Sequence, residues 1–176
     1  MGIFAINRTA DVSRKTDALS INYFPSVLAL ARVQANLHRS VSLLLQLIAS
    51  SDEQRIRQLD GQIKVLQAAD DKDIQFYEST PFTPEEARIY ADSKTTRARF
   101  LEIFSEVHRV GQSTDAKEIA RAQQIFAQQL SPVFEKYSDD VLSLVDINKA
   151  GADRGMGSIQ QTVASTNRGM IIGIIL

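Results

Sequence analysis

The stretch YFPSVLALARVQANLHRSVSLLLQLI (23–48) carries apolar side chains at alternating steps of three and four residues. This spacing places them on one face of an α-helix and forms a heptad seam for packing against other helices. The stretch therefore predicts a long helix that belongs to a helical bundle. The seam consists of Tyr23, Val27, Leu30, Leu37, Val41, Leu44 and Ile48, with Gln34 in its one gap.

Capping signals divide the chain into four helical segments, which are predicted to cover roughly residues 5–50, 53–78, 84–110 and 115–170. Four amphipathic helices with short connections predict an all-α fold, an antiparallel up-down-up-down four-helix bundle with long first and last helices. The glycine-rich run AGADRGMG (150–157) predicts a flexible or slightly bent stretch in the last helix. The capping signals are Ser51 before Gln54, Thr83 before Pro84 and Glu86, and Asp115 before Glu118 after a stop at Gly111.

Composition excludes several classes of function. The chain of 176 residues has 20 basic and 21 acidic residues, so it offers no basic face for nucleic acid. It has no cysteine, which excludes a disulfide framework and cysteine metal sites. Its two histidines, His38 and His108, have no neighbour at metal-ligand spacing, and no paired Glu-x-x-His motif occurs. We expect no enzymatic activity, no cofactor and no metal.

Both ends of the chain are apolar. MGIFAIN (1–7) and the run after Arg168 in NRGMIIGIIL (167–176) are each shorter than the roughly 20 residues that cross a membrane. We interpret residues 1–7 as the end of a first transmembrane helix, 8–168 as a sensor domain and 169–176 as the start of a second transmembrane helix. The domain would then face the periplasm from the inner membrane. The alternative is that both ends are frayed apolar tails or small pieces of core.

The first helix carries more apolar surface than one seam needs. A helix that is apolar on two faces is usually covered on two sides. We therefore expect a homodimer in which this helix packs on its own copy; the alternative is deeper burial within a single bundle. The second face consists of Leu28, Ala29, Val33, Ser40, Leu43 and Leu47.

The order of these elements resembles the periplasmic four-helix-bundle sensor domain of methyl-accepting chemotaxis receptors. Locally, NLHRSVSLLLQ (36–46) is similar to a stretch on the first helix of the aspartate-sensing receptors. The resemblance implies that Arg39 stands where an arginine holds a ligand carboxylate across the dimer face. Two further arginine positions of that cage fall on Gln34 and Leu43, so the resemblance implies the place of sensing and not aspartate as the ligand.

Three arginines are candidates for ligand binding. Arg32 and Arg39 are seven residues apart and share one stripe of the first helix, where they would bind an anion or cover apolar surface with their stems. Arg97 interrupts the apolar seam of the third helix together with Arg99, Thr95 and Thr96. One of these residues would close a pocket within one subunit; the alternative is an exposed charged face.

Four glutamines are further candidates. Gln34 interrupts the first seam, and Gln123 is expected on the corresponding stripe of the last helix, where each would bind ligand or fix the register. Pro132 cannot donate a backbone hydrogen bond and obstructs the carbonyl of Gln128. The resulting bend is either harmless or exposes an acceptor close to Gln124 and Gln128.

The sequence thus favours the extracytoplasmic ligand-sensing domain of a bacterial transmembrane chemoreceptor. It would bind a small organic molecule, with organic acids as one class, and pass a displacement of the last helix across the membrane. The alternative is a structural or partner-binding bundle in the sensor of a histidine kinase or cyclase, without a small-molecule pocket. A buried polar cavity that contains an arginine would favour the first interpretation.

Overall fold

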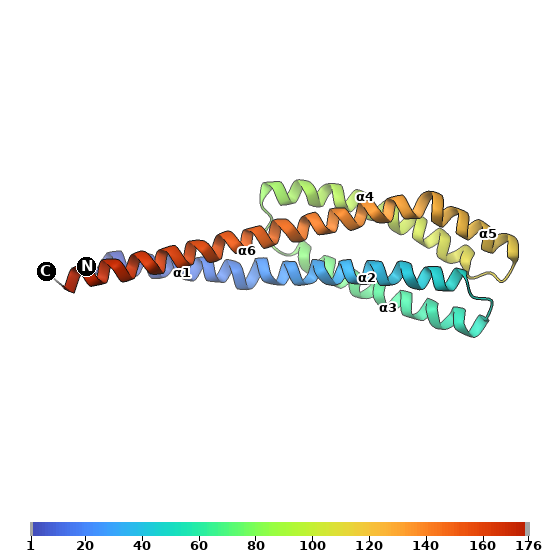
Figure 1. The fold of residues 1–176 in the computed structure, drawn as a ribbon, viewed down its shortest axis with the longest axis horizontal. Helices are drawn as coiled ribbons and strands as arrows, with labels where there is room; N and C mark the ends of the chain where they lie inside the picture. Colours follow the sequence, from blue (N-terminus) through green and yellow to red (C-terminus); the bar gives the residue numbers. More distant parts are fainter. Residues whose placement is uncertain (1, 175–176) are drawn as a thin grey trace. The chain divides into compact units, whose positions relative to one another are not determined.

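The computed structural model describes residues 2–174, with side chains for residues 10–165, and every described element is helical (Figure 1). The four predicted segments are confirmed. The first is continuous through α1, η1 and α2, and the last through α5, η2 and α6, where η marks a π-helical segment. The elements are α1 (Gly2–Asp17), η1 (Ala18–Tyr23), α2 (Phe24–Ile48), α3 (Glu53–Glu78), α4 (Pro84–Gly111), α5 (Ala116–Ile125), η2 (Phe126–Leu130) and α6 (Ser131–Ile174).

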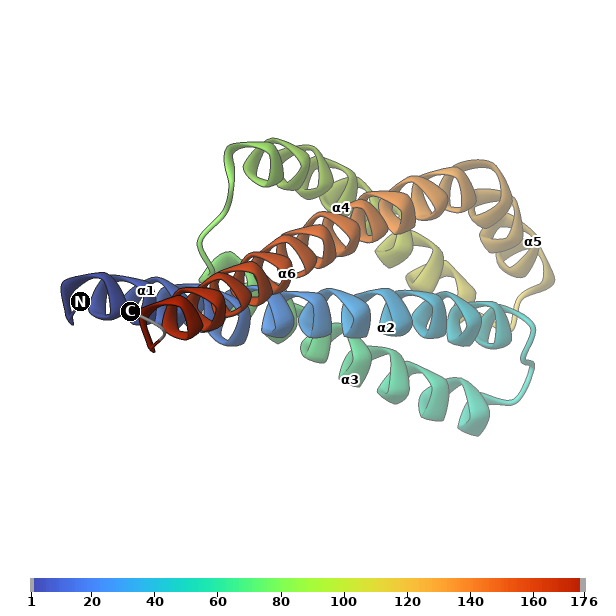
Figure 2. The same ribbon diagram turned by 60° about the vertical axis from the view of Figure 1, so that its left-hand side comes forward.

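The chain divides into two compact units. One combines the terminal segments Met1–Leu28 and Asp146–Leu176, and the other is Ala29–Val145. In the second unit α2, α3, α4 and the last helix form the predicted bundle, in which successive helices reverse direction through short connections (Figure 2). Its core is built from the predicted seams, because apolar side chains at helical spacing are removed from water together. Fully buried members include Leu30, Leu44, Leu59, Ile63, Phe104, Val107, Leu130 and Leu144.

The helix starts agree with the predicted caps at two of three places. The Thr83 hydroxyl accepts from the Glu86 N–H at 3.2 Å, and the Glu86 carboxylate accepts from the Thr83 N–H at 3.3 Å. Asp115 accepts from two backbone N–H groups, as expected of an N-cap. The predicted cap at Ser51 is wrong. Asp52 caps α3 instead, because its carboxylate is placed to accept from the Gln54 N–H at 2.8 Å.

The glycines have a packing role. α4 ends at Gly111 as predicted, but no glycine in the described part of the chain has a positive φ. A Cβ at position 111 would lie 2.8 Å from Cγ1 of Ile48, so glycine lets the ends of α2 and α4 approach closely.

α6 runs as continuous helix through 150–157, the stretch that was predicted to be flexible or slightly bent, so its glycines do not interrupt the helix. In the unit of terminal segments, a Cβ at Gly151 would overlap the ring of Tyr23, and one at Gly155 would lie 3.1 Å from Cδ2 of Leu19. Glycine there admits large side chains of the first helix. Because Tyr23 meets Gly151 and Leu19 meets Gly155, the two segments run antiparallel within this unit.

No helix in the described residues has the length and apolar character needed to span a membrane. Arg8, Arg168 and the apolar runs 1–7 and 169–176 lie outside the residues whose side chains are described. The interpretation of these runs as parts of transmembrane helices therefore stays a prediction.

Each π-helical segment ends two residues before a proline. The Phe24 N–H donates to the Leu19 carbonyl just before Pro25, and the Ser131 N–H donates to the Phe126 carbonyl just before Pro132. A proline cannot donate and clashes with the carbonyl four residues earlier, so widening the helix by one residue relieves the conflict. The disturbance predicted at Pro132 thus takes the form of a π-helical segment. The one at Pro25 was not predicted.

The second apolar face of the first helix is covered differently from the expectation. Five of its six members, all but Leu28, are buried within a single chain, because the first helix lies deep in its own bundle. The argument for a dimer from this face is therefore wrong. Leu28 alone is exposed, at 56%.

Candidate functional site

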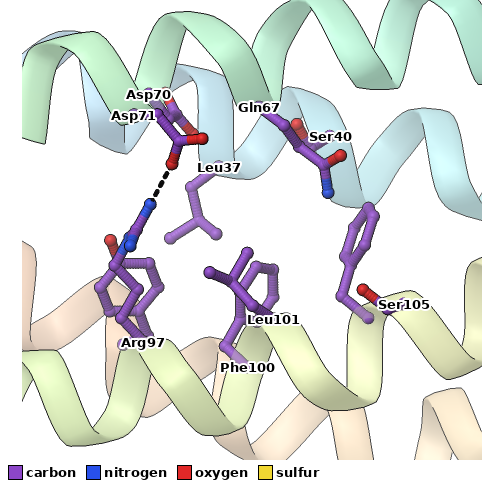
Figure 3. A pocket seen from close by; sticks show the side chains of 11 residues that line it. Leu37, Ser40, Gln67, Asp70, Asp71, Arg97, Phe100, Leu101 and Ser105 are labelled. Atoms are coloured by element: carbon purple, nitrogen blue, oxygen red, sulfur yellow. Dashed lines mark hydrogen bonds and ion pairs between the residues drawn. The ribbon is translucent and has the colours of Figure 1, made fainter.

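A cavity of about 240 Å³ lies within the unit Ala29–Val145, between α2, α3, α4 and α6 (Figure 3). Its α2 and α6 side is buried, whereas the α3 and α4 side includes exposed residues, so it opens between α3 and α4. The lining residues labelled in Figure 3 form three parts: charged Asp70, Asp71 and Arg97, then apolar Leu37, Phe100 and Leu101, then neutral polar Ser40, Gln67 and Ser105. Phe104 and Tyr137 complete the lining.

The charged residues lie at this place because two of them occupy core-facing positions of their helices. Asp70 lies four residues after buried Leu66 and four before buried Ile74 on α3. Arg97 lies three residues before buried Phe100 on α4. A charged side chain at a seam position is carried into the bundle by the same periodicity that buries its neighbours. The cavity is therefore the place where two apolar seams are interrupted together.

Arg97 is held by an acid on the neighbouring helix. Its Nη2 donates to Oδ1 of Asp71 at 2.6 Å, and the exposed fractions are 24% for the arginine side chain and 63% for the aspartate. Burial opposes the charge on Arg97, but the nearby Tyr137 and Asp71 outweigh it and raise the pKa of the guanidinium. Arg97 is thus a fixed cation at the edge of the cavity, and its partner is largely in water.

Asp70 is a half-buried acid with a neutral partner. Nδ2 of Asn36 on α2 donates to its Oδ1 at 2.9 Å. Burial raises the pKa of Asp70 to about 7, although the Asn36 hydrogen bond and the charge of Arg97 both act to lower it. A desolvated carboxyl group binds its proton more tightly, since the charged form has lost part of its hydration. Near neutral pH this carboxyl group is therefore divided between its neutral and charged forms.

The buried wall supplies two hydroxyl groups. Tyr137 on α6 is 4% exposed, and burial raises the pKa of its phenol to about 12. Ser40 on α2 is also 4% exposed, and its Oγ has no hydrogen-bond partner in the described part of the chain. Buried hydroxyl groups are nearly always hydrogen-bonded, so an unpartnered one on a cavity wall is a group that a ligand can satisfy.

The three arginines predicted to bind ligand lie at three different places and do not form one site. Arg97 lines the cavity, whereas Arg99 is exposed and pairs with Glu102 at 2.7 Å. A role of Arg97 in ligand binding stays a prediction. Arg32 forms a bidentate ion pair with Asp73 on α3, with Nε to Oδ2 at 3.1 Å, so its fork is already occupied. Arg39 is exposed in a surface hollow of about 320 Å³ beside α3, and no ion pair of its guanidinium lies within the described side chains.

The predicted glutamines do not line the cavity. Gln34 is half-buried and links helices, since its Nε2 donates to the Ser138 hydroxyl on α6 at 2.7 Å. The expected seam position of Gln123 is wrong, because Gln123 is exposed while its neighbour Ala122 is fully buried. The register of this helix is set by Ala122 and Ile125. Gln124 and Gln128 are exposed and hydrogen-bond each other at 3.3 Å.

Sequence reasoning missed Asp70, Tyr137 and Ser40. The signal for Asp70 was present: the apolar spacing Ile56, Leu59, Ile63, Leu66 continues through position 70 to Tyr77. An acid at a seam position, like Gln34 in the first seam, is a polar residue that would bind ligand or fix the register. Ser40 was placed on the second apolar face of the first helix, and Tyr137 shares the helical spacing of Leu130, Val141 and Leu144. Neither pattern contains a sign of a void beside these residues.

The cavity has the character of a binding site. No group of three or more histidine and acidic side chains that could hold a metal occurs among the described residues. The cavity combines a fixed cation, a titratable acid, hydroxyl groups and apolar surface, which together can orient a small polar molecule.

Comparison with known proteins places the chain in a family. Residues 1–163 match the family described as "four helix bundle sensory module for signal transduction". Searches of curated proteins and of solved structures gave no match. The family match, the four helices with long first and last members and the order of elements agree. The chain belongs to the family of four-helix-bundle sensory modules of methyl-accepting chemotaxis receptors, which are non-catalytic modules of signal transduction.

Proposed function

We propose that this module is the extracytoplasmic sensing domain of a bacterial transmembrane chemoreceptor. In this proposal it binds a small organic molecule and transmits binding as a displacement of its last helix. The domain faces the periplasm, and residues 1–7 and 169–176 belong to the adjoining transmembrane helices. Membership of the sensory family supports the proposal, as does the antiparallel packing of the two terminal segments in one unit.

The cavity is the observation that carries the proposal. A polar cavity with a half-buried Arg97 favours a small-molecule sensor over a partner-binding or structural bundle of a kinase or cyclase sensor. Tyr137 links the cavity to output, because it lies on α6, the helix that continues toward the C-terminus. A ligand that prefers one position of Tyr137 shifts the balance between two helix packings.

Two further parts of the proposal concern the surface. Arg39 is a second candidate contact for an organic acid, because its guanidinium is exposed and unpaired among the described side chains. A homodimer through the first helix would use its outward face, on which Ala31, Ala35 and Leu45 are exposed. The absence of cysteine makes this testable. Ala35→Cys is expected to give a disulfide-linked dimer on mild oxidation, whereas a cysteine at exposed Val65 on α3 is not.

The displacement is tested in the membrane-embedded receptor with spin labels at Lys72→Cys on α3 and Glu135→Cys on α6, diluted with unlabelled chain. Both positions are exposed. A compound that raises the melting temperature, chosen from organic acids, amines and amino acids, is expected to shift the distance between the labels by about 1–2 Å. Labels at Gln46→Cys on α2, which is also exposed, and Lys72→Cys serve as the control pair.

Binding without any change in the α3 to α6 distance would contradict the transmission mechanism. If no compound of the panel raises the melting temperature, the small-molecule sensor itself is wrong. The location is tested separately by labelling Val65→Cys in whole cells with a membrane-impermeant maleimide. Labelling only after lysis would contradict the periplasmic orientation.

A further inference from the structure

The charges around the cavity are paired, with one exception. Arg97 pairs with Asp71, Arg32 with Asp73, and Lys94 with Glu78 on the neighbouring surface of α3 and α4. Among the described side chains, Asp70 has an amide donor, Asn36, and no ion pair. The charge of Arg97 acts on Asp70, but Arg97 is already paired with Asp71. When the carboxyl group of Asp70 is ionised, the charged part of the lining therefore carries a net negative charge.

A carboxylate ligand fits this arrangement poorly. It would have to take Arg97 away from Asp71 and then lie close to the carboxyl group of Asp70. An ammonium group beside Asp70 leaves the ion pair of Arg97 with Asp71 intact. It also gives the carboxylate of Asp70 a cationic partner of its own. Opposite charges in contact stabilise each other more in a partly desolvated site than in water.

The opposite end of the cavity selects for a hydrogen-bonding group. The Ser40 hydroxyl is buried and without a partner among the described residues, and Gln67 lies beside it (Figure 3). Gln67 and Asp70 are three residues apart on α3, so the two ends are separated by about one helical turn, roughly 5 Å. Leu37 and Phe100 form the apolar surface between them. The volume of about 240 Å³ exceeds the roughly 150 Å³ cavity that is known to hold benzene.

We propose that this cavity binds a short-chain primary amine, with the ammonium group at Asp70 and a hydroxyl group at the opposite end near Ser40. The proposal rests on the small-molecule sensor proposed above and names the ligand class. The ammonium donates to the free oxygen of Asp70, the carbon chain lies on Leu37 and Phe100, and the distal hydroxyl bonds to Ser40.

The charge on Asp70 gives the proposal a signature in pH. The pKa of Asp70 is about 7 without ligand, so near neutral pH some molecules carry a protonated Asp70. An ammonium ligand binds the ionised form, so these molecules lose that proton when the ligand binds. Affinity for an amine therefore rises with pH, and affinity for a carboxylate falls. The polar groups that face Asp70 are Asn36 on α2, Asp71 and Asp73 on α3, Arg97 on α4 and Tyr137 on α6.

The test is titration calorimetry of the 176-residue chain with 4-amino-1-butanol, n-butylamine and butyrate at pH 6, 7 and 8. For a group with a pKa of about 7, the ionised fraction and hence the amine affinity rise about tenfold from pH 6 to pH 8. The amino alcohol is expected to bind about 3–10-fold more tightly than n-butylamine, since it satisfies Ser40. Equal affinities of these two amines would overturn the orientation.

Variants then locate the contacts. Asp70→Asn is expected to weaken amine binding at pH 8 by about 10–100-fold and to abolish its dependence on pH. Ser40→Ala is expected to remove the difference between the two amines. Asp139→Asn on the exposed surface of α6 is the control and keeps wild-type affinity. Circular dichroism shows whether each variant is folded, and the wild-type titrations decide the ligand class without any variant.

The outcomes separate the two proposals. If butyrate binds and the amines do not, or if amine affinity is the same at pH 6 and pH 8, the amine proposal is overturned while the sensor of small molecules stands. If neither these probes nor any compound of the wider panel binds, the sensor proposal fails as well.

Discussion

Glu86 and Asp70 are two carboxylic acids inside the same helical unit, and their surroundings are opposite. Glu86 is 1% exposed and accepts hydrogen bonds from the Tyr77 hydroxyl at 2.6 Å and the Thr83 N–H at 3.3 Å. Asp70 is half-buried beside a cavity, with the Asn36 amide as its hydrogen-bond donor. A buried acid surrounded by donors holds structure together, whereas an acid next to a void has room for a ligand.

The largest expected effect tests the structural acid. Glu86→Ala leaves the Tyr77 hydroxyl without its 2.6 Å acceptor and breaks the capping box with Thr83. We expect the free energy of unfolding to fall by about 2–4 kcal/mol, measured by urea denaturation followed by circular dichroism. Glu85→Ala next to it, which is exposed, should change it by less than about 0.5 kcal/mol. Similar losses in both variants would show that Glu86 is not a structural acid.

The next effect has the opposite sign. In the folded chain burial raises the pKa of Asp70 to about 7, above its unfolded value, so folding takes up a proton. The free energy of unfolding is therefore higher at low pH, where Asp70 is protonated in the folded chain. This contribution is lost as the pH rises toward 7 and above. Asp70→Asn keeps a neutral acceptor for Asn36 and removes the ionisation.

Asp70→Asn should therefore stabilise the module at pH 8 by about 1–3 kcal/mol, a value reduced from full linkage because the carboxyl group is partly exposed. The gain should become small at pH 4. Denaturant melts of both proteins across this range measure it. A gain that is equal at both ends of the range would exclude ionisation of Asp70 as its cause.

The smallest effect concerns the unpartnered hydroxyl. Ser40→Ala removes a buried donor that has no partner among the described residues, so we expect a gain of about 0.5–1 kcal/mol. Ser42→Ala, at an exposed position of the same helix, corrects for the difference in helix propensity. If Ser40→Ala is no more stable than this control, a bound water satisfies the hydroxyl and the comparison with Glu86 is weaker.

Much of the fold was predictable, because its signals are local. The seam through Leu30 and Leu44 and the capping box of Thr83 and Glu86 depend on residues three or four positions apart. Their outcome is decided within one or two turns of helix. The error at Ser51 shows the limit of such signals, since the neighbouring Asp52 competes for the same N–H groups.

The candidate site was predictable only in part. Arg97 was one of two arginines that interrupt the third seam and were considered for a pocket; it lies on the cavity wall, whereas Arg99 is exposed. Gln123 was expected at a seam position and is exposed, because a small error in helical phase moves a side chain to the opposite face. The glycines at 151 and 155 were interpreted as part of a flexible or slightly bent stretch; their packing role depends on side chains more than 100 positions away and was not predicted.

The sequence by itself determined four helices, their ends and the faces that turn inward, since hydrogen bonding and burial at steps of three and four residues are local properties. Only the tertiary structure decided that Asn36, Asp70 and Arg97, on three different helices, surround one cavity. Their meeting depends on how each helix is shifted along its neighbours, and many packed side chains fix that shift together. A void beside a charged residue arises from this packing and has no signature of its own in the order of residues.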